Sequence, residues 1–168
     1  MTISMYQASV PRFANLLGNL SAILDKAQAH ADARKLDVTV LTSSRLFPDM
    51  FPLNRQVQIA CDTAEGVIAR LAGAAIPAHD DSEKTLAELK TRIAGAIAFI
   101  QTMTPAQIDG TEDKAIVTKR GDKETHYTGM QFLLGHAVPN LYFHITTTYN
   151  ILRHNGVEIG KRDYLGKP

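Results

Sequence analysis

Apolar residues recur at alternating spacings of three and four in four separate segments, and this rhythm constrains the fold more than any other feature. Such spacing gathers the apolar side chains on one side of an α-helix, and that side has to be buried against other helices. The four rows are Tyr6, Val10, Phe13, Leu17, Leu20, Leu24 and Ala27; Leu53, Val57, Ala60, Ala64, Val67 and Leu71; Leu86, Leu89, Ile93, Ile97, Ile100 and Met103; and Leu134, Val138, Leu141, Ile145, Thr148 and Leu152. The pattern predicts four amphipathic helices packed as a bundle.

Local signals mark the ends of these helices. Asp49 is expected to cap the second helix and Pro52 to lie in its first turn, while Gly73 ends it. Residues 80–82, Asp-Asp-Ser, offer caps for the third helix. Gly156 follows the fourth helix at a position where glycine commonly terminates helices.

One segment departs from the helical rhythm. Residues 116–119 and 124–127 are rich in β-prone side chains, and Arg-Gly-Asp at 120–122 joins them as a turn. We expect a hairpin that closes over one end of the bundle, so that deleting residues 114–127 would leave the helices largely intact. The predicted fold class is therefore all-α, a four-helix bundle with a small β-hairpin before the last helix, in a single domain spanning residues 1–168.

Composition narrows the classes of function. The chain has 168 residues, a formal net charge of +1 and no long run of like charge, which argues against a nucleic-acid partner. The longest nearly unbroken apolar run, residues 93–100, is too short to cross a membrane, and the first residues lack the features of a secretory signal. The single cysteine, Cys61, excludes an intrachain disulfide and suits a reducing compartment. We expect a cytoplasmic protein without a membrane segment.

The fourth helix carries the most informative polar residues. His136, Asn140 and His144 are spaced i, i+4 and i+8, which places them along one side of the helix. At about 100° per residue, His144 lies at the edge of the apolar row and faces the bundle interior, while His136 reaches solvent. Asn140 and His144 can converge on one ligand, whereas His136 leans away from them. Pro139 lacks the N–H that would bond to the preceding turn, so it is expected to bend the helix.

The second helix offers partners for these side chains. Gln58 and Asp62 lie beside its apolar row, and a carboxylate at 62 facing His144 would orient the imidazole ring or complete a cation site. The other interpretation is that both are solvated residues on the flank of an amphipathic helix. The remaining histidines, at positions 30, 79, 126 and 154, are interpreted as surface, loop or capping residues.

The end of the chain resembles a known superfamily. Residues 143–157, FHITTTYNILRHNGV, are similar to the last helix of the DinB/YfiT-like superfamily, whose members share the four-helix layout. Residues 46–53, 126–129 and 156–166 resemble an uncharacterised bacterial branch of it, known as a domain of unknown function. Better-known members hold a divalent ion with three histidines from the second and fourth helices, and many are homodimers. By this resemblance His144 matches one ligand and Asn140 replaces another, and the second helix here has no histidine.

Three functional hypotheses follow, and whether the protein is an enzyme stays open. In the first, His144, Asp62 and Asn140 hold a divalent metal (Zn, Ni or Mn) in a transferase or hydrolase of small molecules. The second is a metal-free pocket for a small-molecule ligand, lined by the set His136, Asn140, Tyr149 and Gln58. In the third hypothesis, the polar residues form a buried network in a structural protein. The resemblance further implies a homodimer.

Overall fold

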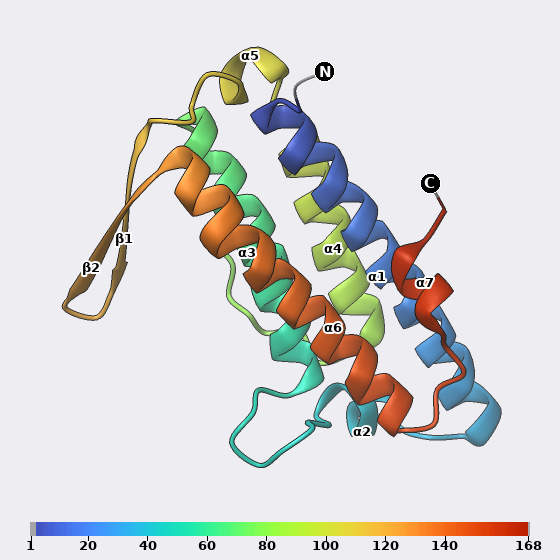
Figure 1. Ribbon diagram of the computed structural model, residues 1–168. Helices are drawn as coiled ribbons and strands as arrows, with labels where there is room; N and C mark the ends of the chain where they lie inside the picture. Colours follow the sequence, from blue (N-terminus) through green and yellow to red (C-terminus); the bar gives the residue numbers. More distant parts are fainter. Residues whose placement is uncertain (1–2, 168) are drawn as a thin grey trace.

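Four long helices lie side by side in the computed structural model, which describes residues 3–167 (Figure 1). They are α1 (Met5–Arg34), α3 (Leu53–Ala72), α4 (Leu86–Gln101) and α6 (Val138–His154). Helix α3 packs against α6 on one side and α4 on the other, and α1 packs along α4. Their apolar rows meet in one core, so the predicted four-helix bundle is confirmed.

Short elements connect and flank these helices. They are α2 (Val38–Thr42), α5 (Pro105–Ile108), β1 (Ala115–Arg120), β2 (Lys123–Thr128), the π-helical segment η1 (Gln131–Ala137) and α7 (Lys161–Leu165), which packs on α1. The two strands pair antiparallel, with Ala115 opposite Thr128 and Arg120 opposite Lys123, around the expected turn. The hairpin projects beside α3 and the start of α6 instead of closing over the end of the bundle (Figure 1).

Two helices begin later than the sequence signals indicate. The N-cap of α3 is Pro52 itself, in extended backbone, so the expected cap at Asp49 is wrong. The N-cap of α4 is Thr85, whose hydroxyl accepts from the Glu88 N–H while the Glu88 carboxylate accepts from the Thr85 N–H. This reciprocal capping box satisfies two backbone donors at once. Residues 80–82 therefore belong to the loop before α4.

The last helix differs from expectation at its start. Residues 131–137 form a π-helix, in which each N–H bonds five residues back and the helix turns less per residue. This segment ends at Ala137, two residues before Pro139, whose missing N–H predicted a disturbance here. The changed turn brings Phe132 and Leu133 into the core and leaves Leu134 52% exposed, so the inward position predicted for Leu134 is wrong. Gly156 closes α6 with φ +84°, as predicted.

Candidate functional site

His144 lies on the buried side of α6, facing α3, and is only 8% exposed. Its Nδ1 is 2.6 Å from Oε1 of Gln56, whose amide nitrogen donates to the carbonyl of Phe51. Since the Gln56 oxygen can only accept, Nδ1 of His144 is the donor. Burial lowers the pKa of His144, and the charge of Arg55 acts in the same direction. The imidazole is therefore a neutral ring held in a satisfied hydrogen bond.

Asp62 contacts a different partner. It lies six residues after Gln56 on α3, which places it roughly 120° away around the helix axis. Its carboxylate forms an ion pair with Arg92 of α4. Burial raises the pKa of Asp62 and Arg92 opposes that rise. The structure therefore does not join Asp62 to His144, because the two side chains leave α3 and α6 toward different neighbours.

Arg92 is the centre of a polar cluster that sequence reasoning missed. Its side chain is 3% exposed and also contacts Glu83, at 3.3 Å, and Asp81, at 3.6 Å. Gln58 donates to the Glu83 carboxylate at 2.9 Å, so it faces α4 and its preceding loop, and not the last helix. We call Arg92, Asp62, Asp81 and Glu83 the Arg92 cluster.

The sequence signal for the burial of Arg92 was its position, since residue 92 falls between Leu89 and Ala96 on the inward row of α4.

His79, in the loop between α3 and α4, also makes a specific contact that its position in the sequence did not predict. Its Nε2 is 2.9 Å from the carboxylate of Glu65, a buried residue on α3. Burial raises the pKa of Glu65, and His79 opposes that rise. With the Arg92 cluster, this contact fastens the loop between α3 and α4 onto the bundle. His79 is thus an exposed loop residue, within its interpretation as a surface, loop or capping residue, and it is also the partner of a buried acid.

The residues present do not fit the metal site that the superfamily implies. Within residues 3–167 no three or more His, Cys, Asp or Glu side chains are grouped so that they could hold an ion. Asn140 donates to the Thr63 hydroxyl at 2.8 Å, while His144 and Asp62 bond to the separate partners described above. Cys61, the one thiol, is buried, and burial raises its pKa far above the ordinary value, so it stays protonated.

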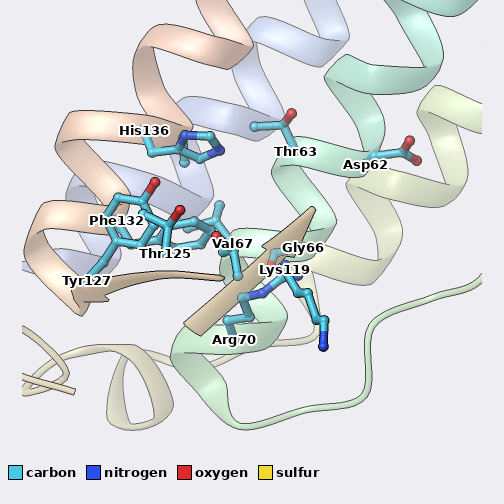
Figure 2. A pocket seen from close by; sticks show the side chains of 12 residues that line it. Asp62, Thr63, Gly66, Val67, Arg70, Lys119, Thr125, Tyr127, Phe132 and His136 are labelled. Carbon is cyan, nitrogen blue, oxygen red and sulfur yellow. Dashed lines mark hydrogen bonds between the residues drawn. The ribbon is translucent and has the colours of Figure 1, made fainter. Parts of the chain in front are cut away.

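A hollow of about 400 Å³ lies between α3, the hairpin and η1 (Figure 2). Its lining residues are Asp62, Thr63, Gly66, Val67, Arg70, Thr118, Lys119, Thr125, Tyr127, Phe132, His136 and Ala137. Helix α3 is distant in sequence from the hairpin and from η1, so the fold brings separate parts of the chain to one concave surface. This volume is in the range of sites that hold small organic molecules.

One side of the hollow is aromatic. The rings of Phe132 and His136 stack at 5.4 Å with an angle of 13° between their planes, one turn apart in η1. Tyr127 from β2 leans against both rings, at 5.4 and 5.9 Å. Arg70 of α3 places its guanidinium carbon 5.7 Å from the centre of the Phe132 ring. Figure 2 shows the aromatic residues on one side and Arg70 with Lys119 at the lower edge.

The four residues predicted to bind a ligand do not meet at one site. His136 lines the hollow, and Asn140 bonds to Thr63, which also lines it. Gln58 belongs with the Arg92 cluster, and Tyr149 packs edge to face on Tyr164 of α7, at 6.3 Å. Tyr127 and Arg70 were not predicted. Their signal was weak, because Tyr127 lies on the hairpin and Arg70 on α3, and only the fold brings both beside η1.

Comparisons with known proteins identify the family. Residues 5–165 match the family described as domain of unknown function DUF1993, and the chain belongs to that family. Its fold is DinB-like. A solved crystal structure of a DinB family member protein from Shewanella denitrificans is 49% identical, with a TM-score of 0.88 over 97% of this chain and 92% of that chain. No curated protein matches. None of the helices that the structure describes is long and apolar enough to cross a membrane.

Proposed function

We propose that this protein binds a small organic molecule, without a metal, in the hollow between α3, the hairpin and η1. The observation that carries the proposal is the convergence there of an aromatic wall, hydroxyl groups and a guanidinium from three separate elements. Ligand sites commonly combine apolar or aromatic walls with a few polar groups that orient the ligand. The hairpin supplies Thr125 and Tyr127 to this surface, which gives a role to an element outside the bundle core.

The geometry favours this function over a metal-dependent transferase or hydrolase. A catalytic metal needs several donors that converge and a position left open for water or substrate. Here His144 donates to Gln56, and Asp62 is neutralised by Arg92. Recruiting them to an ion would break a buried hydrogen bond and strip a buried arginine of a carboxylate, both of which cost free energy.

The test compares two tryptophan variants of the hairpin. Untagged protein in EDTA is screened against small metabolites by thermal shift, and hits are measured by calorimetry. Thr125→Trp fills the hollow, whereas His126→Trp points to the opposite face of the same strand. We expect hits that raise the melting temperature of the parent protein and of His126→Trp but bind Thr125→Trp at least tenfold more weakly. The proposal is overturned if no compound binds, if binding requires an added metal, or if Thr125→Trp binds normally.

A further inference from the structure

Arg70 differs from Arg92 in the side chains that surround its guanidinium. Arg92 contacts three carboxylates, but no aspartate or glutamate of residues 3–167 lies within ion-pair distance of Arg70. The guanidinium of Arg70 instead donates to the carbonyl of Gly66 at 2.8 Å and lies over Phe132. Burial lowers the pKa of Arg70, which means that its charge is partly desolvated. A desolvated cation is stabilised by an anion, and the hollow is the space open to one.

Gly66 makes this placement of Arg70 possible. A Cβ atom at position 66 would lie 2.8 Å from Nη1 of Arg70, closer than such atoms approach without movement. Glycine is unfavourable inside a helix relative to alanine, and position 66 is well inside α3. Helix stability therefore does not account for a glycine at position 66. It leaves room for the guanidinium to fold back along α3 to the edge of the hollow.

The remaining polar groups of the hollow suit a negatively charged ligand. Asp62, the one acid among the lining residues, is paired with Arg92 and its charge is compensated. Thr118 and Thr125 stand opposite each other on the two strands and both line the hollow, so their hydroxyls can donate. Lys119 at the rim is positively charged too, and its ammonium nitrogen lies 3.8 Å from the carboxylate of Glu124 on the neighbouring strand.

We propose that the ligand is a small planar ring that carries an anionic group, either a carboxylate or a phosphate. The anion pairs with Arg70, whose planar fork of donors matches both groups, and the ring lies against Tyr127 and His136. This inference rests on the proposed function, since it assigns the chemical class of the ligand to the same hollow.

Simple probes separate the contributions of ring and charge. Benzoate and phenyl phosphate carry both features, benzyl alcohol carries the ring alone, and acetate and inorganic phosphate carry the charge alone. Binding is followed by chemical-shift titration of the untagged protein. We expect benzoate or phenyl phosphate to bind at least tenfold more tightly than each of the three partial probes. Which of the two binds better identifies the anionic group.

Two variants test the role of Arg70. Arg70→Met should abolish the preference for the charged ring over benzyl alcohol. Gly66→Ala should weaken binding of the charged ring at least fivefold without lowering the melting temperature, because alanine favours the helix while its methyl group displaces the guanidinium. The matched control is Lys123→Gln, which removes a positive charge from the same hairpin at a position outside the hollow and should leave binding within twofold.

The outcomes distinguish the two proposals. Uncharged rings could bind as tightly as benzoate, with Thr125→Trp blocking their binding. In that case the hollow is a ligand site, but the proposed anionic class of ligand is wrong. Equal preference for the anion in the parent protein and in Arg70→Met likewise overturns the role of Arg70. Absence of binding by every probe and every screened compound overturns both proposals.

Discussion

Replacing Arg92 with methionine tests whether the Arg92 cluster holds the loop before α4 on the bundle. Methionine replaces the aliphatic part of the arginine side chain, so the main loss is the charged guanidinium with its hydrogen bonds. Three carboxylates, those of Asp62, Asp81 and Glu83, would then lie close together with Arg55 as the nearest remaining cation. The wild-type arrangement is stable because one buried cation is shared by three acids.

The exposure of these acids sets the expected size of the effect. Removing one partner of a fully buried ion pair costs about 3–5 kcal/mol. The side chains of Asp62, Asp81 and Glu83 are 39%, 32% and 17% exposed, so water compensates part of the loss. We therefore expect Arg92→Met to lower the free energy of unfolding by about 2–3 kcal/mol. For a chain of this length that corresponds to a fall of roughly 4–12 °C in melting temperature.

Urea denaturation followed by circular dichroism at 222 nm measures the change. The matched control is Lys90→Met on the same helix, because Lys90 pairs with Asp25 at the surface and exposed pairs contribute at most about 1 kcal/mol. Burial raises the pKa of Asp62 and Arg92 opposes that rise, so without Arg92 the folded protein protonates Asp62 more readily and the deficit should shrink as pH falls from 7 toward 4. A stability of Arg92→Met equal to that of the parent, or a deficit independent of pH, would refute this reasoning.

Three further predictions concern pH, metal and assembly. Because burial lowers the pKa of His144, its contribution to stability is complete above pH 6.5 and is lost as pH falls through the folded pKa. His144→Gln should therefore flatten this part of the plot of unfolding free energy against pH, measured by urea denaturation. Dialysis against EDTA should leave the melting temperature within about 1 °C and release less than about 0.1 metal ion per chain by mass spectrometry, since a bound metal would stabilise the fold by mass action; a stoichiometric ion contradicts it. If the expected homodimer forms and α6 is its interface, Phe143→Glu should give a monomer in light scattering, because Phe143 is 55% exposed and a charge in an apolar interface is costly. An unchanged mass would exclude that face.

The positions of the helices were largely predictable from the sequence. Apolar spacing located all four long helices, and the β-prone runs around Gly121 located the hairpin, because these signals depend on neighbours within a few residues. Errors occurred where a local signal competed with another one. Asp49 and residues 80–82 are good caps, but Pro52 and the Thr85–Glu88 pair start the helices in their place.

The candidate site was predictable only in part. The helical position of His144 indicated correctly that it is buried, and His136 was correctly placed outside the core, where it lines the hollow. The partner of His144 was not predictable, since Gln56 and Asp62 are both polar residues beside the same apolar row. Which of them meets the imidazole depends on how α3 is rotated against α6, and the apolar row defines that rotation only broadly.

Periodicity, turn chemistry and composition thus determined the architecture of this protein: four amphipathic helices, one hairpin and one core. Only the tertiary structure decided which polar groups meet. It paired Asp62 with Arg92, left Arg70 at the edge of the hollow and brought Tyr127 of the hairpin to the π-helical turn. The physical reason is range: apolar burial acts through the pattern of a whole helix face, whereas a hydrogen bond or ion pair depends on the positions of two atoms within about 3 Å.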